Sequence, residues 1–221
     1  RPRPGSGEPG SAPPEGRVYL YGLHTVRAAI ANPDRTIHKL LATRNALARL
    51  EIADIDALPC AVELAEPRAI DRIAGGDAVH QGVVLETEPL APKPLSALGD
   101  TRLVVALDQV TDPHNVGAIL RTAVAFGAGA LITTARHSPS ESGVLAKSAS
   151  GALEHIDLIA VRNLAAGLEA LHQAGFLTVG LDSEGPDELE ASLHGDRVAL
   201  VLGAEGKGLR QKTRATVNRL A

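Results

Sequence analysis

The second half of the chain alternates aliphatic runs with helical stretches, and this alternation constrains the fold more than any other feature. Continuous aliphatic runs are typical of strands that are buried on both faces, and they predict strands at 103–107, 130–134, 156–161, 176–181 and 197–202. Other stretches have the apolar spacing of helices and predict helices at 115–126, 140–151, 163–174 and 206–219. This order of elements predicts an α/β domain with a mainly parallel sheet and helices on both of its faces.

The first half has the pattern of a separate, smaller α/β domain. Strand-like and helical segments alternate over residues 17–88, in shorter pieces than in the second half. The next segment, ETEPLAPKPLSALGD at 86–100, holds three prolines, and such a composition is typical of linkers. We therefore predict a domain at 17–88, a linker at 89–100 and a second domain at 101–221. Residues 1–16 contain almost no apolar side chains, which predicts a disordered leader.

Composition narrows the classes of function. The net charge is −4 at neutral pH, so a nucleic-acid ligand would have to be bound by a local basic patch. The single cysteine, Cys60, excludes an intramolecular disulfide and a cysteine-rich metal site, and it favours a reducing compartment. No apolar run reaches the roughly 18–20 residues that a membrane-spanning helix needs. We therefore expect a cytoplasmic protein without a metal site or a membrane partner.

The stretch DQVTDPHNVGAILR, residues 108–121, joins a predicted strand to a predicted helix. Pro113 cannot continue the strand, and it disfavours helix at the residue before it. Asn115 is a favoured N-cap residue, so the helix is predicted to begin there and to carry Arg121 on its first turns. Asp108 is interpreted as the polar end of the strand. A polar turn between a buried strand and a helix N-terminus is a frequent place for ligand binding.

A second strand-to-helix turn, in ALVLGAEGKGLRQK at 199–212, is rich in glycine and contains Glu205. It is neither a P-loop nor the glycine fingerprint of dinucleotide-binding folds. On glycine content alone, a tight structural turn and a ligand-binding turn remain alternatives, and Glu205 favours the second. Five cations and no acid follow between Gly206 and Ala221. They form either a phosphate-binding stripe or a solvated helix face.

The two turns, DQVTDPHNVGAILRTA and LVLGAEGKGL, resemble the first two signature motifs of the SpoU/TrmH RNA 2′-O-ribose methyltransferases. The front part, from YGLHTVRAAI to DAVHQGVVLE, is similar to the substrate-binding domain of that family, which has a fold like ribosomal protein L30e. The resemblance covers about residues 17–219, and the pattern is most similar to bacterial enzymes that methylate a guanosine ribose in large-subunit ribosomal RNA. It implies a SPOUT fold, in which the C-terminal chain forms a trefoil knot that holds S-adenosylmethionine.

The resemblance also implies partners and roles for individual residues. Arg121 would stabilise the alkoxide that develops on the 2′-oxygen, and Asn115 and Glu205 would complete the catalytic set by orienting its guanidinium. The residues that would bind the cofactor are Leu181, Leu202, Gly203 and Gly206. The residues that would contact RNA are Arg44, His80, Lys207 and Arg210. The partners would be structured RNA, most of all ribosomal RNA, and a second copy of the chain, bound through the catalytic domain.

One departure from the family leaves alternatives open. The third family motif, a proline–glycine loop followed by Ser-Leu-Asn-Val-Ser, has no counterpart in the sequence. A non-catalytic RNA-binding or ribosome-assembly factor on the same fold is therefore an alternative, as is a methyltransferase that acts on transfer RNA. A dinucleotide-dependent oxidoreductase fits the strand–helix alternation, but the missing fingerprint and the cation-rich tail disfavour it. For Arg121, an ordinary salt bridge on the helix surface is the alternative to catalysis.

Overall fold

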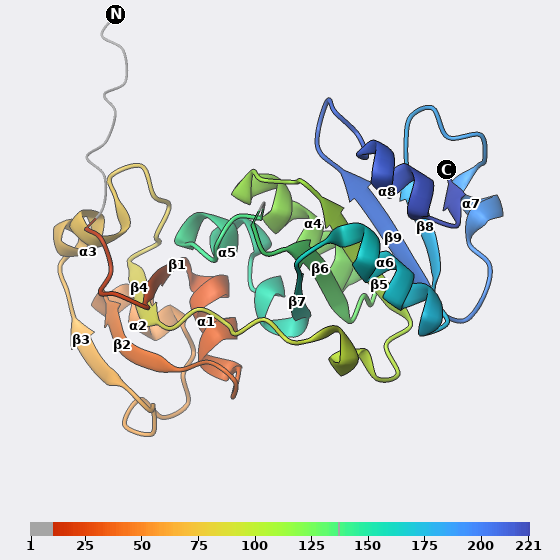
Figure 1. Ribbon diagram of the computed structural model, residues 1–221. Coiled ribbons are helices and arrows are strands. Elements are labelled where there is room, and N and C mark those ends of the chain that lie inside the picture. The colour runs from red at the N-terminus through yellow and green to blue at the C-terminus, as the bar shows by residue number, and fades with distance from the viewer. Residues whose placement is uncertain (1–10, 137) are drawn as a thin grey trace, which may run out of the picture. The chain divides into compact units, whose positions relative to one another are not determined.

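The computed structural model describes residues 11–136 and 138–221, which form two compact units (Figure 1). In the described part of the chain, no helix is long and apolar enough to cross a membrane. Residues 1–10 of the predicted leader lie outside the described residues, and Ser11 donates a hydrogen bond to the Arg72 carbonyl oxygen. The first unit comprises the described chain up to Leu90 and Glu141–Glu154, and the second comprises Ala91–Ser140 and His155–Ala221.

The first unit is built on a four-stranded sheet. Its elements are β1 (Val18–Tyr21), α1 (Leu23–Ala31), β2 (Ile37–Ala42), α2 (Arg44–Arg49), β3 (Ala61–Leu64), α3 (Pro67–Ala74), β4 (Val83–Thr87), α5 (Gly143–Ala149) and, from Ala152 to His155, the 3₁₀ helix η2. The strand order is β1-β4-β2-β3, with β4 antiparallel to both neighbours and β3 parallel to β2 at an edge. Every residue of β4 is buried, and Leu20, Leu40 and Leu85 from the three paired strands are completely enclosed. The centre of the unit is therefore apolar.

A buried ion-pair cluster holds the segment Glu141–Glu154 to the first unit. The Arg35 side chain is fully buried, and its guanidinium meets Glu141 at 2.6 Å and Glu154 at 2.5 Å. The Leu90 backbone N–H donates a further hydrogen bond to the Glu141 carboxylate at 2.9 Å. The sequence predicts this segment in the second domain, whereas the structure groups it with the first unit. The reason is that buried charges need enclosed partners of opposite sign, and Arg35 supplies one.

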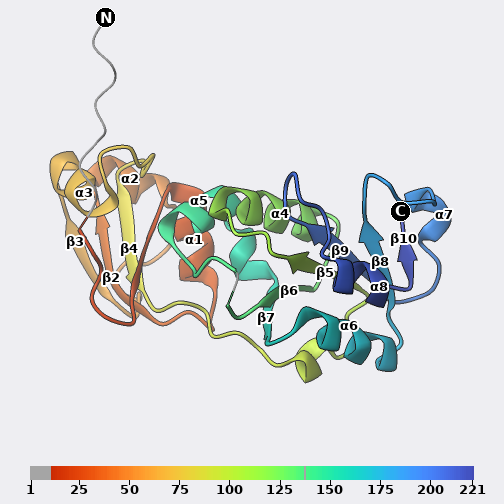
Figure 2. The ribbon, with the colours of Figure 1, turned by 45° about the horizontal axis from the view of Figure 1, so that its top comes forward.

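The second unit is built on a six-stranded sheet in which every strand pair is parallel, as predicted. Its elements are the 3₁₀ helix η1 (Leu95–Leu98), β5 (Leu103–Asp108), α4 (Pro113–Ala125), β6 (Ala130–Thr134), β7 (Asp157–Val161), α6 (Leu164–Gln173), β8 (Leu177–Leu181), α7 (Leu189–Ser192), β9 (Val198–Gly203), α8 (Gln211–Thr216) and β10 (Arg219–Leu220). The strand order is β10-β8-β9-β5-β6-β7, and α4 and α6 lie on opposite faces of the sheet (Figure 2).

Side chains alternate along the central strands, so the two faces of this sheet differ. Val104 and Val201 point to the face covered by α6 and belong to the main core of the unit, together with Leu168 of that helix. Val105 and Leu200 point to the α4 face, where they line an apolar pocket. One face is thus a closed core, whereas the other keeps an apolar hollow beside α4.

The predicted linker is packed against the second unit. Leu98 of η1 is buried in its core. The Lys93 backbone N–H donates to the Leu158 carbonyl oxygen at 2.7 Å, and the Lys93 ammonium pairs with Asp157 at 2.7 Å. The prolines predict a loose connection over 89–100, but these contacts place most of it alongside β7.

Candidate active site

The first signature turn runs from β5 into α4. Gln109 has a positive φ of 60°, which is uncommon for a residue other than glycine. Asp112 is the N-cap residue, because its carboxylate accepts a hydrogen bond from the His114 backbone N–H at 2.9 Å. The prediction that Asn115 caps the helix is wrong by three residues, since the fixed φ and missing N–H of Pro113 suit the first helical position. Asn115 therefore lies inside the first turn, and its side chain is available for other contacts.

The second signature turn follows β9 and requires glycine. Gly206 and Gly208 have positive φ values of 73° and 63°, and the Gly208 N–H donates to the Ala204 carbonyl oxygen at 2.8 Å. At Gly203 a Cβ atom would lie 2.2 Å from the carbonyl carbon of Gly208. The backbone thus closes on itself and leaves no room for a side chain at that position. Glu205 lies on this turn, where its side chain is exposed.

The basic stripe after this turn is only partly helical. The sequence predicts a helix over 206–219, but α8 spans only Gln211–Thr216. Left-handed glycine conformations in the turn delay the start of the helix, and Val217 leaves it with an extended backbone at φ −62° and ψ 151°. Within α8, Arg214 pairs with Asp182 at 2.9 Å. The predicted helix is therefore wrong at both ends.

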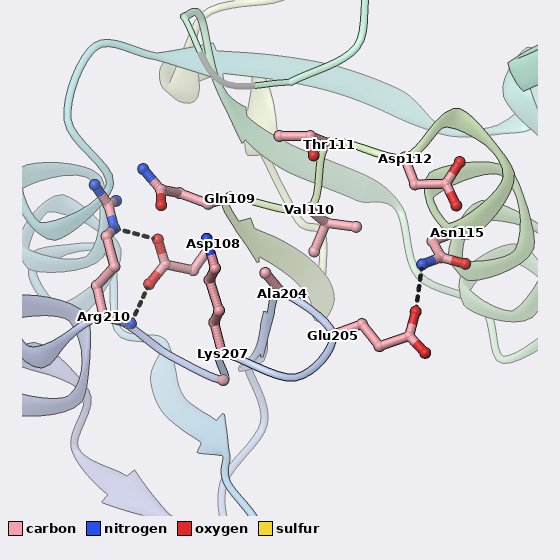
Figure 3. A pocket seen from close by; sticks show the side chains of 11 residues that line it. Asp108, Gln109, Val110, Thr111, Asp112, Asn115, Ala204, Glu205, Lys207 and Arg210 are labelled. Carbon is pink, nitrogen blue, oxygen red and sulfur yellow. Dashed lines mark hydrogen bonds and ion pairs between the residues drawn. The ribbon is translucent and has the colours of Figure 1, made fainter.

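Strand register brings the two turns together. β5 and β9 are adjacent parallel strands, and Asp108 is the register partner of Gly203. The turns that leave them meet where the Asn115 amide nitrogen donates a hydrogen bond to Glu205 Oε2 at 3.2 Å (Figure 3). They enclose a polar pocket of about 420 Å³, lined by Asp108, Gln109, Val110, Thr111, Asp112, Asn115, Ala204, Glu205, Lys207, Gly208 and Arg210. Four of the predicted site residues thus line a single pocket.

One acid–base pair lies at the wall of this pocket. Asp108 is completely buried. Its Oδ2 accepts a hydrogen bond from the Arg210 backbone N–H at 2.8 Å, and its Oδ1 accepts one from Arg210 Nε at 2.6 Å (Figure 3). The Arg210 side chain remains 43% exposed. Asp108 thus fixes both the backbone and the side chain of Arg210, and part of the guanidinium stays accessible.

The apolar pocket contains two of the predicted cofactor residues. Leu181 and Leu202 are register partners at the ends of β8 and β9. Gly203 follows Leu202 directly, whereas Gly206 lies further along the exposed turn. The structure therefore places Leu181, Leu202 and Gly203 close together, and Gly206 apart from them. The pocket has a volume of about 740 Å³ and is lined by Leu103, Val105, Ala118, Ile119, Thr122, Ala123, Phe126, Leu181, Leu189, Leu193, Gly195, Val198, Leu200 and Leu202.

Arg121 stands apart from the other two predicted catalytic residues. It is exposed on α4, six residues after Asn115, which at about 100° per residue places the two side chains roughly 120° apart around the helix. Arg121 is not among the residues that line the polar pocket, and the Glu205 carboxylate is bonded to Asn115 instead. That Asn115 and Glu205 orient the Arg121 guanidinium therefore stays a prediction.

Comparisons with known proteins identify the family. A profile described as "SpoU rRNA Methylase family" matches residues 102–221, and one described as "RNA 2'-O ribose methyltransferase substrate binding" matches residues 19–93. The chain belongs to the SpoU rRNA methylase family. It is 39% identical over 208 residues to the 23S rRNA (guanosine-2'-O-)-methyltransferase RlmB of Pseudomonas putida, covering 88% of this chain and 82% of the relative. The RlmB of Ralstonia nicotianae is 36% identical over 214 residues, covering 91% and 84%.

Solved structures agree with this assignment at the level of the fold. A putative RNA methyltransferase of the TrmH family from Porphyromonas gingivalis matches with a TM-score of 0.74 and 26% identity, covering 93% of this chain and 79% of that one. The SpoU methyltransferase AviRb from Streptomyces viridochromogenes, solved in complex with AdoMet, matches with a TM-score of 0.75 and 21% identity, covering 93% and 80%. The predicted family and its α/β architecture are confirmed.

The remaining RNA-binding candidates lie in the first unit. Arg44 is exposed in the first turn of α2, directly after the N-cap residue Thr43. His80 is engaged by the protein itself: its Nε2 lies 2.8 Å from Asp71 Oδ1, and its Nδ1 accepts from the Gly82 N–H at 2.9 Å. The structure therefore leaves Arg44 available to a ligand, whereas both ring nitrogens of His80 already have partners.

The sequence prediction missed the role of Asp108. It interpreted this residue only as the end of a strand, whereas the structure makes it the partner of Arg210 in the pocket wall. A signal was present, because a carboxylate directly after an aliphatic run lies at the carboxyl edge of a parallel sheet, where ligands usually bind. In the described part of the chain, no group of His, Cys, Asp or Glu side chains could hold a metal ion.

Proposed function

We propose that this protein transfers a methyl group from S-adenosylmethionine to the 2′-hydroxyl of a guanosine ribose in large-subunit ribosomal RNA. The observation that carries the proposal is the hydrogen bond between Asn115 and Glu205, which joins the two signature turns in one polar pocket. Family membership supports it, as do the relatives in Pseudomonas putida and Ralstonia nicotianae, which are named as 23S rRNA guanosine 2′-O-methyltransferases. Such a substrate implies action in the cytoplasm.

The polar pocket supplies groups suited to holding a ribose hydroxyl. Transfer needs the 2′-oxygen about 3 Å from the methyl carbon and in line with the bond that breaks. When bound, S-adenosylmethionine supplies an electrophilic methyl group on a sulfonium, whose sulfur keeps the electron pair of the broken bond. Glu205 Oε2 is held by Asn115, and the Glu205 carboxylate would accept a hydrogen bond from the 2′-hydroxyl and take its proton as the carbon–oxygen bond forms. Lys207 and Arg210, which line the same pocket, bind the neighbouring phosphates.

Arg121 contributes positive charge to the transition state. A guanidinium keeps its proton in proteins, so Arg121 stabilises the developing alkoxide and the adjacent phosphate and does not act as a base. Its exposed position on α4 leaves it accessible to RNA. It lies about a third of a turn around the helix from Asn115, and in this proposal its side chain reaches the ribose from there when RNA is bound.

The residues at the ends of β8 and β9 fit S-adenosylmethionine. Leu181 and Leu202 place two apolar side chains side by side at adjacent strand ends, which suits an adenine ring. Gly203 follows Leu202 directly, and the backbone of the turn packs where a Gly203 side chain would be, which keeps the turn close to these two leucines. We assign cofactor binding to these three residues and to Gly206 on the turn that follows.

We also propose that the C-terminal chain forms the trefoil knot of the SPOUT fold. Supporting this, the loop after β8 lies directly over the end of the described chain. A Cβ atom on Gly185 would be 2.6 Å from the Ala221 carbonyl carbon, and Ala221 exchanges backbone hydrogen bonds with Asp182 and Gly180. These contacts support the proposal, because a threaded chain would pack against the loop that covers it.

Homodimerisation through the catalytic domain belongs to the same proposal. The apolar pocket lies beside α4, and two large side chains at it are exposed, Phe126 at 78% and Leu193 at 41%. Exposed apolar surface of this kind is typical of protein–protein interfaces. A second copy of the chain would cover it.

For the first unit we propose an L30e-like fold that binds structured RNA. The substrate-binding profile matches residues 19–93, and the exposed Arg44 at the start of α2 offers a cation to the phosphate backbone. This proposal keeps 17–88 as the RNA-binding part of the chain. Contacts by His80 receive no support, because its ring is held by Asp71 and Gly82.

Methyl transfer from labelled S-adenosylmethionine to large-subunit ribosomal RNA tests the proposal. The RNA is isolated from a strain that lacks the gene, and the labelled nucleotide is mapped after digestion. We expect label on the 2′-oxygen of a guanosine, and much slower labelling with Glu205→Gln. Methylation of transfer RNA alone would favour a methyltransferase that acts on transfer RNA. RNA binding without any methylation would favour a non-catalytic factor.

A further inference from the structure

Asp108 is an ionisable residue at the end of an otherwise aliphatic strand, and it is completely buried. Enclosing a carboxylate costs free energy unless it is paired and hydrogen-bonded, and an apolar residue of similar volume often stabilises a fold as well or better. Stability alone therefore does not account for a carboxylate here. Its two hydrogen bonds to Arg210, at 2.8 Å and 2.6 Å, point to a role in geometry.

The glycine turn begins beside Asp108 and is bonded to its carboxylate at the other end. At the start of the turn, Gly203 is the register partner of Asp108 in the parallel ladder between β5 and β9. After the turn, Arg210 is bound to the Asp108 carboxylate through its backbone and its side chain. Glu205 lies between these two points, on a stretch with two positive-φ glycines. Glycine is the most permissive residue in its backbone angles, so the position of Glu205 depends on how the ends of the turn are held.

We propose that Asp108 is a positioning residue for methyl transfer, which holds the turn so that Glu205 meets Asn115. The inference rests on the proposed function of the pocket. Asp108 acts through Arg210 and not by touching the substrate, because its side chain is enclosed. Releasing Arg210 would let the turn move, and Glu205 would lose its hydrogen bond to the Asn115 amide, now 3.2 Å long.

The test compares Asp108→Asn and Glu205→Gln, singly and together, in the full-length protein. Asparagine keeps the shape of the side chain but offers only one acceptor where Arg210 now finds two. We expect Asp108→Asn to lower kcat about 100-fold, since a misplacement of about 1 Å has an effect of that size. KM for RNA should rise much less than kcat falls, because Lys207 still lines the pocket and binds phosphate. In the Glu205→Gln background the same change should lower kcat little further, because residues that act as a unit are not additive.

Two further variants keep the test decisive. Arg210→Ala removes the side-chain bond but keeps the backbone bond, so its loss of kcat should be smaller than that of Asp108→Asn. Thr178→Val removes partly buried hydrogen bonds to His172 and Asn218 elsewhere in the second unit, and it should lower the melting temperature without lowering kcat. A normal kcat for Asp108→Asn would overturn the inference. So would a double variant whose loss of kcat equals the product of the two single losses. A wild-type protein without any transfer would instead overturn the proposed function.

Discussion

The two units each contain an arginine–carboxylate cluster, and the two clusters are built in opposite ways. In the first unit the Arg35 side chain is fully enclosed, and its partners Glu141 and Glu154 are 5% and 1% exposed. In the second unit the acid, Asp108, is enclosed, whereas its partner Arg210 stays 43% exposed. The Arg35 guanidinium is therefore closed to ligands, whereas the Arg210 guanidinium is accessible at the polar pocket.

This difference in exposure indicates that the first cluster has a structural role and the second a functional one. An ion pair whose two side chains are both buried fixes two segments of chain, because separating them leaves a buried charge without a partner. An ion pair buried only on the acid side fixes an arginine and still leaves it able to bind phosphate. We therefore expect substitutions in the first cluster to affect folding and those in the second to affect turnover.

The largest effect is expected for Arg35→Met. It leaves Glu141 and Glu154 buried without their cation, so the free energy of unfolding should fall by about 3–5 kcal/mol. Arg210→Met should cost clearly less, because Asp108 keeps the backbone hydrogen bond and water can reach the vacated side. Urea denaturation of the two variants measures both values. Equal losses of unfolding free energy would contradict the distinction between the Arg35 cluster and the Asp108–Arg210 pair.

Arg121 extends the comparison to an arginine that is exposed and lines neither pocket. Arg121→Ala should lower turnover by roughly 10²–10³-fold, the usual effect of removing a group that stabilises transition-state charge. Its free energy of unfolding should stay within about 0.5 kcal/mol of the wild type. Arg121→Lys should also fail, because a point charge does not reproduce the planar guanidinium. Single-turnover rates decide the matter, and a near-normal rate would exclude Arg121 from the mechanism.

The closed cluster should also have a pH signature. Burial, opposed by Arg35, raises the pKa of Glu141 above its usual value. Between the unfolded and the folded pKa the native protein binds more protons, so the contribution of this carboxyl to stability falls as pH rises through that window. Glu141→Gln removes this dependence. The unfolding free energy of the variant minus that of the wild type should therefore increase with pH across the window, and a decrease would contradict the assignment.

The smallest effect is expected for an ion pair that is exposed on both sides. Lys39 and Glu63 join β2 and β3 at 2.5 Å, with side chains 36% and 55% exposed. Glu63→Gln should change the free energy of unfolding by about 0–1 kcal/mol, because water and side-chain entropy offset the attraction. Denaturation at low and high salt measures it. A loss as large as that of Arg35→Met would show that burial does not determine how much an ion pair contributes to the free energy of unfolding.

The sequence was most informative where a pattern is local. Aliphatic runs placed the five long strands of the second unit to within one residue at each end, because burial on both faces demands a continuous apolar run. The start of α4 was missed because the N-cap preference of Asn115 was given more weight than the preference of Pro113 for the first helical position. The helix after Glu205 was missed because left-handed glycines extend the turn.

Contacts between distant segments could not be predicted in this way. Arg35 lies 106 residues from Glu141 and 119 from Glu154, and no periodicity links positions so far apart. The meeting of Asn115 with Glu205 was accessible only through the family motifs, because it depends on β5 and β9 being neighbours in the sheet. The placement of Arg121 followed from neither source, since it depends on the rotation of α4.

The grouping of Glu141–Glu154 with the first unit has a consequence for how the molecule can be taken apart. The chain passes between the units at three peptide bonds, after Leu90, after Ser140 and after Glu154. A protease that cuts the proline-rich segment therefore removes one of three tethers, and the nicked protein remains held together. A fragment that begins at residue 101 retains the segment Glu141–Glu154 without the rest of the first unit. Glu141 and Glu154 in that fragment have lost their partner, Arg35. Limited digestion should yield a stable nicked molecule, not two separable halves.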